Sequence, residues 1–435
     1  MKIRLICISI CLIFLLSSFS IAINNVDSTD DPLDGGWLEE LNGIKILHVS
    51  GSNYEMGYQH GYLLKEEAKQ NLRAFLDSAG ISFEELLDIW HEMEEYCPQE
   101  YIDEMQGIAD GGGVTFEEVV AGYMVLVHGD MGCFGISSWG PATADKKLYH
   151  TRCFDQPVDI QDPETGIFAH DNHILIVRNP DDGYASLIPS VAGGLHGGGG
   201  INSEGIAIGQ QVCWSQDQTF HGVSGIFRTQ MVLDYASTAQ EAIDILTNNR
   251  TLGWNFIVSD SKIPIGYVVE TTASHYYVGT YDNPTESYIP FWQIDHTVRR
   301  NNFFIDPTMA DSQRTSYNPG GLLNFIKLVQ RKDIFFAIWQ SYKIMSMEIE
   351  KHLGLMDLES TMNMMKKGYC GNTNFLLYLI FKLAEGTSFN RAWNIWVACP
   401  ETGDMIVSFA DRDQVAQFTV QHCYNLFELL EENPP

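Results

Sequence analysis

The residue types best suited to chemistry are a cysteine that follows a glycine, Gly132-Cys133, and two charged residues further along the chain, Arg152 and Asp155. If the chain is cut before Cys133, this residue carries both a thiol and a free α-amine with a pKa near 8, and the amine can accept the thiol proton. No separate histidine is then required. Glycine tolerates the strained backbone in which a thiol attacks the preceding carbonyl. We therefore predict that Cys133 is the nucleophile and that the Gly132–Cys133 bond is the cleavage site.

The elements around Cys133 are predicted to place the two charged residues beside it. A helical run covers Phe116 to Val127, and the period changes to strands after Cys133. The return strand of a hairpin that begins at Cys133 spans Leu148–Phe154. There, Asp155 would bind the α-ammonium and Arg152 would favour the thiolate. The alternative is an ordinary salt-bridged strand pair.

The remaining pattern divides into a helical first part and a mixed second part. Apolar spacing from Tyr54 to about Tyr101 is helical, and so is the spacing at Gln230–Leu246 and Leu322–Met347. The predicted strands are Ile174–Val177, Ala185–Pro189, Gly205–Val212, Phe256–Ser259, Gly266–Glu270, Tyr276–Tyr281, Asn394–Ala398 and Met405–Phe409. Strands flanked by helices indicate an α+β domain of stacked sheets between helical layers.

The chain is predicted to divide into four consecutive segments. Lys2 and Arg4, an apolar stretch and a small-residue site mark residues 1–22 as a signal peptide. Residues 23–36 read as an acidic disordered leader. Residues 37–132 form a helical N-terminal part, which becomes the small chain after self-cleavage, and residues 133–435 form the catalytic large chain of the same domain. We expect a secreted or extracytoplasmic protein, or a membrane-anchored one if the signal stays uncleaved.

Composition excludes some partners and leaves others open. The net charge of −30 would repel phosphate, so we expect no nucleic-acid partner. Beyond the signal, no segment approaches about 18 consecutive apolar residues, so we expect no stable membrane span. His170 and His173 lack a glutamate in zincin spacing, and we predict neither a metal nor a cofactor. Seven cysteines remain after the signal, and the odd number indicates a free thiol, whereas the pairing of the others stays open.

Several ordered motifs resemble one family. The hairpin from Cys133 to Asp155 resembles the start of the mature chain in the acyl-coenzyme A:isopenicillin N acyltransferase family, which belongs to the N-terminal nucleophile hydrolases together with choloylglycine hydrolases, penicillin V acylases and acid ceramidases. Further similar segments are Gly51–Gly61 with its Met-Gly-x-Gln-x-Gly pattern, Gly200–Ala207, Phe256–Asp260 with Glu270, Arg299–Phe303 and Asp311–Arg314. The resemblance implies a four-layer αββα sandwich.

The resemblance also implies roles for residues outside the hairpin. Asn301 would be the side-chain donor to the oxyanion, aided by a backbone N–H near Gln211. Asn202 is more easily explained as a tight-turn residue, and Arg314 would either face a substrate carboxylate or be structural. Departures from the family pattern are Phe134-Gly135 after the cysteine, Gln156 after the aspartate, and Asn302 where histidine is usual.

Two other interpretations remain open. A Cys-His hydrolase without self-cleavage would use His150, His196 or His296 as its base. A secreted binding protein without catalysis would keep the fold with an unreactive Cys133. The glycines that follow His196 resemble an esterase oxyanion loop, but the chain has no Gly-x-Ser-x-Gly elbow, so we interpret them as a flexible turn.

The sequence thus favours an exported, self-processed amidohydrolase or acyltransferase that works through a thioester. We expect a small-molecule acyl-amide substrate, such as an N-acyl amino acid, a peptide or a related amide. An amine or an acyl-coenzyme A is a possible acyl acceptor or donor. The two fragments would remain together as a heterodimer.

Overall fold

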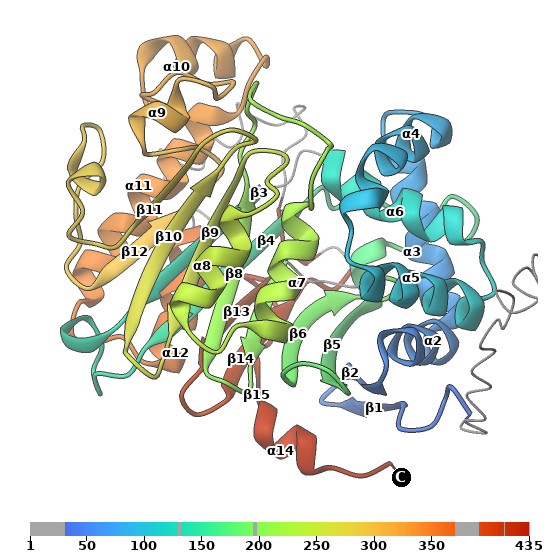
Figure 1. The fold of residues 1–435 in the computed structure, drawn as a ribbon. Helices are drawn as coiled ribbons and strands as arrows, with labels where there is room; N and C mark the ends of the chain where they lie inside the picture. Colours follow the sequence, from blue (N-terminus) through green and yellow to red (C-terminus); the bar gives the residue numbers. More distant parts are fainter. Residues whose placement is uncertain (1–30, 129–131, 195–197, 370–390, 413, 435) are drawn as a thin grey trace, which may run out of the picture.

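The computed structural model describes residues 31–128, 132–194, 198–369, 391–412 and 414–434 (Figure 1). The predicted signal peptide and most of the acidic leader lie outside these residues, as do His196 and the residues just before Gly132. None of the helices in the described ranges combines the length and apolar character needed to cross a bilayer.

The N-terminal part opens with a β-hairpin that the helical interpretation of residues 37–132 did not include. Strand β1 (Trp37–Leu41) pairs antiparallel with β2 (Ile44–Gly51). The turn residues Asn42 and Gly43 both have positive φ, at 57° and 79°, as a type I′ turn requires. Residues 37–132 thus contain two strands besides their helices, and these strands extend a large sheet.

The acidic leader also ends in an ordered turn rather than in disorder. The side-chain amide of Gln59 donates to the carbonyls of Pro32 and Asp34, at 3.2 and 2.9 Å, and the Ser50 hydroxyl donates to the Gly35 carbonyl. These bonds satisfy backbone groups of residues 31–36, so that part of the leader has a defined conformation.

Helices follow the hairpin as the apolar spacing predicted. They are α2 (Asn53–Leu63), α3 (Lys65–Ser78), α4 (Phe83–Met93), the 3₁₀ turn η1 (Glu94–Tyr96), α5 (Gln99–Gly112) and α6 (Phe116–His128). Helix α2 begins at a capping box made by Ser52 and Glu55, and α4 begins at the same motif made by Ser82 and Glu85. The last helix, α6, ends next to the predicted cleavage site.

The described strands form two sheets (Figure 1). The first has the order β1-β2-β5-β6-β7-β8-β9-β10-β11, in which β2 and β5 are the parallel pair. Its other members are β5 (His173–Pro180), β6 (Ser186–Val191), β7 (Gly199–Asn202), β8 (Ile206–Val212), β9 (Trp254–Asp260), β10 (Ile265–Thr271) and β11 (Tyr276–Gly279).

The second sheet has the order β12-β3-β4-β13-β14-β15. Its strands are β3 (Gly132–Ser138), β4 (Tyr149–Gln156), β12 (Thr297–Arg300), β13 (Arg391–Cys399), β14 (Asp404–Phe409) and β15 (His422–Asn425). The predicted strands thus match observed strands, with boundaries shifted by a few residues.

Both long helical predictions of the second part are split in two. Gln230–Leu246 falls on α7 (Gly225–Tyr235) and α8 (Ala239–Thr247), and Leu322–Met347 falls on α10 (Leu322–Val329) and α11 (Phe335–His352). Helix α8 has its own capping box from Thr238. The remaining α-helices of the described residues are α9 (Pro307–Ala310), α12 (Leu358–Tyr369) and α14 (Leu426–Glu431).

Three apolar cores show how the layers stack. The outer face of the first sheet packs on α2 to α8 through residues such as Ile176 and Ile208. The two sheets meet through Leu175 and Trp396 and their neighbours, and the outer face of the second sheet packs on α11 and α12 through Phe134. The order helix, sheet, sheet, helix confirms the predicted α+β fold as a four-layer αββα sandwich (Figure 1).

Candidate active site around Cys133

The hairpin that starts at Cys133 forms as predicted. Strands β3 and β4 pair antiparallel with Cys133 opposite Phe154 and Gly135 opposite Arg152. The Arg152 Nη2 lies 3.3 Å from the Cys133 sulfur, and its Nε donates to the Gln210 carbonyl at 3.0 Å. Arg152 is fully buried, so its charge acts on the thiol with little screening from water.

Burial determines the pKa of the Cys133 thiol in the uncut chain. Desolvation raises the pKa of this thiol to about 11, which outweighs the lowering by the Arg152 charge. The Asp155 carboxylate raises the pKa further, while the Asp155 backbone N–H lowers it by hydrogen bonding to the sulfur. The thiol is therefore protonated near neutral pH and needs a base to become a nucleophile.

Asp155 is a buried carboxyl group next to this thiol. Burial raises its pKa to about 7, against the lowering by a hydrogen bond from Cys153 and by Arg152. The Cys153 thiol donates to Asp155 Oδ1 at 3.1 Å. The structure thus brings Cys133, Arg152 and Asp155 together, as predicted from their spacing.

Asn302 contacts Cys133 directly, although its residue type indicated only a departure from the family pattern. The Cys133 backbone N–H donates to Asn302 Oδ1 at 2.8 Å, and Asn302 Nδ2 donates to the Val212 carbonyl at 2.8 Å. Asn302 therefore holds the nitrogen that would become the α-amine if the chain were cut before Cys133. In the sequence, the feature that points to Asn302 is its position beside Asn301 in the family motif.

The side chain of Asn301, the predicted oxyanion donor, binds other groups than Cys133 in this uncut chain. Its Nδ2 donates to the Ile338 carbonyl of α11 at 3.3 Å, and its Oδ1 accepts from the Asn302 N–H at 2.8 Å. These two side-chain hydrogen bonds fix the chain at Asn301, and neither of them involves Cys133. The predicted role of Asn301 stays a prediction.

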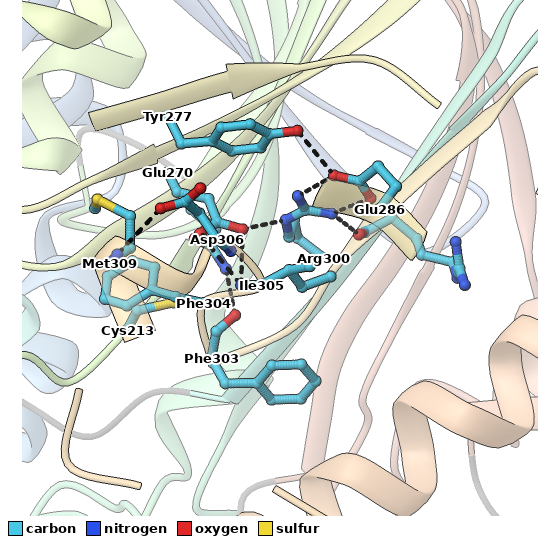
Figure 2. Close-up of polar contacts among 12 residues, drawn as sticks. Cys213, Glu270, Tyr277, Glu286, Arg300, Phe303, Phe304, Ile305, Asp306 and Met309 are labelled. Carbon is cyan, nitrogen blue, oxygen red and sulfur yellow. Dashed lines mark hydrogen bonds and ion pairs between the residues drawn. The ribbon is translucent and has the colours of Figure 1, made fainter. Parts of the chain in front are cut away.

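A buried ion cluster fixes the segment that carries both asparagines (Figure 2). Arg300 donates to Glu270 through Nε at 2.7 Å and to Glu286 through both terminal nitrogens, at 2.9 and 2.5 Å. Glu270 also accepts the backbone N–H groups of Ile305 and Asp306, at 2.9 to 3.2 Å. The guanidinium and the two carboxylates are each at most 3% exposed, so the cluster is rigidly paired and anchors residues 300–306.

The other three predicted residues have distinct placements. Asn202 accepts the N–H groups of Glu204 and Ile206 and donates to two carbonyls of the α7 region, so its side chain stabilises the turn after β7. Gln211 is fully buried on β8. Arg314 is exposed and lies over the Trp214 ring, 5.2 Å from its centroid.

A cavity of about 1390 Å³ lies next to the β4 and β8 ends near Asp155 and Asn302. Its wall includes Val212, whose carbonyl binds Asn302, and Gln156, which follows Asp155 on β4. Apolar residues from the ends of α3 and α6 contribute further, and Arg314 is the one basic side chain among the described residues of the lining. The cavity is therefore suited to an apolar group with a polar end.

The histidines of the Cys-His alternative lie in other surroundings. His150 Nδ1 is 2.7 Å from the Ser259 hydroxyl, and burial lowers the pKa of His150 to about 3. It faces Ser137 across the ladder, four pairs away from Cys133. His296 stacks on Tyr281, and His196 lies outside the described residues.

The cysteines and the possible metal ligands of the chain lie in several places. The six described cysteines, Cys97, Cys133, Cys153, Cys213, Cys399 and Cys423, are free thiols. Within the described ranges, a possible metal-ligand cluster of Glu39, His48 and Glu432 lies at the first hairpin and the C-terminal segment, away from Cys133. His170 Nε2 contacts the Arg412 carbonyl at 2.7 Å rather than His173.

Parts of the chain are similar to known proteins. Residues 167–301 match the family model of acyl-coenzyme A:6-aminopenicillanic acid acyl-transferase. An uncharacterized protein of Archaeoglobus fulgidus is 28% identical over 52% of this chain and 43% of its own length, so the match spans less than half of that relative. Protein dcd1B of Dictyostelium discoideum is 22% identical over 69% of this chain and 67% of its own length.

Among solved structures, the Caenorhabditis elegans orthologue of N-acylethanolamine-hydrolyzing acid amidase is 13% identical, with a TM-score of 0.38 over 67% of this chain and 99% of that one. The family match over residues 167–301 confirms the predicted resemblance to this acyl-transferase family.

Proposed function

We propose that this protein is a self-processing cysteine amidohydrolase or acyltransferase that acts on a linear acyl amide. The observation that carries the proposal is the buried Cys133–Arg152–Asp155 cluster at the start of β3, directly after Gly132. The family match covers β5 to β12 and supports acyl-transfer chemistry on the same fold.

Maturation would change the role of the Cys133 nitrogen. The thiol would attack the Gly132 carbonyl, and the Gly132–Cys133 C–N bond would break as the Cys133 nitrogen takes a proton, which gives a thioester and a free amine on Cys133. Water would then hydrolyse this thioester, releasing the Gly132 carboxylate and the thiol. That amine accepts the thiol proton, and Arg152, 3.3 Å from the sulfur, stabilises the thiolate. Asp155 and Asn302 Oδ1 then hold the resulting ammonium.

The proposed reaction passes through a thioester. The Cys133 sulfur forms a bond to the acyl carbon, the carbonyl π electrons move to oxygen, and the C–N bond breaks as the leaving amine takes the proton from the α-ammonium. Water or an amine then attacks the thioester and releases the thiol. The cavity beside Gln156 and Val212 would hold the acyl group.

The proposal includes export and a two-fragment product. Residues 1–22 have the pattern of a signal peptide. Residues up to Gly132 would form the small fragment, and strand β2 of that fragment lies between β1 and β5 in the first sheet. The seven residue pairs between β2 and β5 support a stable complex of the two fragments.

Replacement of the nucleophile tests this function. We expect Cys133→Ala to abolish release of the fluorescent amine from 7-amino-4-methylcoumarin amides of acetic, phenylacetic and decanoic acids, because no thioester can form. Cys399→Ala removes another buried thiol of the same sheet and should keep the wild-type rate. An active Cys133→Ala variant, or a folded wild type inactive on every amide tried, would contradict the proposal.

A further inference from the structure

Gln211 of β8 carries a buried amide that no other described group satisfies. The residue is 0% exposed, and neither its Oε1 nor its Nε2 has a hydrogen-bond partner within the described structure. Buried polar side chains are normally paired, because burial removes their bonds to water. An exception of this kind calls for a physical reason, and a catalytic role is one of the recognised reasons.

The unpaired amide lies on the same side of β3 as the nucleophile. A Cβ atom on Gly135 would be 2.7 Å from Gln211 Nε2 and 3.0 Å from the Ile257 side chain, so Gln211 occupies the space above Gly135. Residues two apart on a strand share a face, so the Cys133 side chain points to this same inter-sheet space. Arg152, which pairs with Gly135, contacts the Cys133 sulfur there.

This packing also accounts for one departure from the family pattern. The resemblance leads us to expect a small hydroxyl residue after the cysteine, whereas this chain has Phe134-Gly135. Any side chain at 135 would collide with the Gln211 amide. Glycine at 135 and glutamine at 211 therefore form a matched pair.

We propose that the Gln211 side-chain amide is a catalytic hydrogen-bond donor to the oxyanion of the tetrahedral intermediate at Cys133. The inference rests on the proposed function and adds a donor to it. As the sulfur bonds to the acyl carbon, the carbonyl electron pair moves to oxygen, and a neutral N–H donor that is already desolvated stabilises that charge without reorganisation. The unpaired state of the amide in the free protein is the expected state of a preorganised donor.

The neighbouring glutamine provides a matched control. Gln210 is also buried, but its Oε1 accepts a hydrogen bond from the Thr229 hydroxyl of α7 at 2.7 Å. Successive residues on a strand point to opposite faces, so Gln210 belongs to the helical side of β8. Its amide is structural, whereas the amide of Gln211 faces the second sheet.

Paired substitutions to methionine, measured on the coumarin amides, test the inference. We expect Gln211→Met to lower kcat by roughly 10²–10³-fold with KM little changed, because the lost donor acts mainly in the transition state. The Tm of Gln211→Met should stay the same or rise, since an unpaired buried amide is removed. Gln210→Met should lower Tm and keep kcat.

Gly135→Ala provides a second test that leaves Gln211 in place. The added Cβ must displace the Gln211 amide, so kcat should fall in this variant too, and Gln211→Met combined with Gly135→Ala should be no slower than the slower single variant. Full kcat in Gln211→Met, or a loss of kcat that follows a loss of Tm, would overturn the inference. A wild type that turns over no amide would instead overturn the proposed function on which the inference rests.

Discussion

At the residue scale, the Cys133 nitrogen has two chemical states. In the uncut chain it is an amide that donates to Asn302 Oδ1, and the neighbouring thiol is held protonated by burial. After the proposed cleavage it would become an amine close to the buried Asp155 carboxyl. The neutral amine would be the base that accepts the thiol proton, and the resulting ammonium would lower the pKa of Asp155 from its raised value.

The raised pKa of Asp155 predicts a pH-dependent effect on stability. Burial raises this pKa to about 7, whereas an unfolded aspartate titrates near 3.9. Between these values the folded chain holds a proton that the unfolded chain has lost, so this carboxyl destabilises the fold progressively as pH rises from about 4 to about 7. In an uncut Cys133→Ala background, Asp155→Asn should therefore raise the free energy of unfolding above pH 7, by on the order of 1–4 kcal/mol, and have little effect near pH 4.

Urea unfolding across this pH range measures the effect, with the exposed Asp159→Asn as the control that should show no such trend. With Cys133 present, Asp155→Asn should lower amidase activity more than stability, because the ammonium loses its counter-charge. Wild-type activity in that variant would rule out a role for Asp155 in catalysis.

Spacing along the chain determined which site residues could be predicted. Cys133, Arg152 and Asp155 lie on one hairpin, so local pattern sufficed to bring them together. Asn302 and Gln211 come from segments after β12 and on β8, and only the packing of the two sheets places Asn302 against Cys133 and Gln211 against Gly135. Neither contact follows from residue types or local periodicity.

At the element scale, the Met-Gly-x-Gln-x-Gly pattern is explained by the contact between α2 and α5. Cβ atoms on Gly57 and Gly61 would lie 2.0 and 2.3 Å from backbone carbonyl oxygens of α5, and Gly107 and Gly111 meet α2 carbonyls in the same way, at 2.2 Å each. The two backbones touch, so the motif is a packing device. Gln59 of the same motif secures residues 31–36.

Two adjacent glycines of α5 test this explanation. A Cβ on Gly111 would be 2.2 Å from the Tyr58 carbonyl oxygen, whereas a Cβ on Gly112 would have its nearest neighbour at 3.7 Å. We expect Gly111→Ala to destabilise the protein by about 1–3 kcal/mol through overpacking. Gly112→Ala should be neutral or stabilising by up to about 1 kcal/mol, because alanine favours a helix. Thermal unfolding of both variants measures the difference, and equal Tm values would disprove the close backbone contact.

Periodicity predicted most elements, and the errors have local causes. The β1–β2 hairpin was missed although Asn42-Gly43 between apolar residues is a known hairpin signal. The helix expected at Gln230–Leu246 breaks at Ala236, where Thr238 begins a new capping box. Apolar spacing continues across that break, so the period alone does not reveal it.

At the scale of the whole molecule, the predicted cleavage site lies at the start of β3, a strand of the second sheet, shortly after α6 ends the helical part. The first fragment would contribute β1, β2 and the helices α2 to α6, which share one apolar core with β5, β6 and β8 of the second fragment. A cut at Gly132–Cys133 therefore leaves the fold intact. The stacking order of the layers was predicted from the resemblance, whereas the strand order became known only from the structure.

Intact mass combined with N-terminal sequencing of the purified, natively expressed protein tests the central claim most directly. We predict two fragments that remain associated: one ends at Gly132, and the other starts Cys-Phe-Gly-Ile and contains residues 133–435. The Cys133→Ala variant should stay a single chain. A wild-type chain that hydrolyses amides while still uncut at Gly132–Cys133 would contradict the claim that the nucleophile is an N-terminal cysteine.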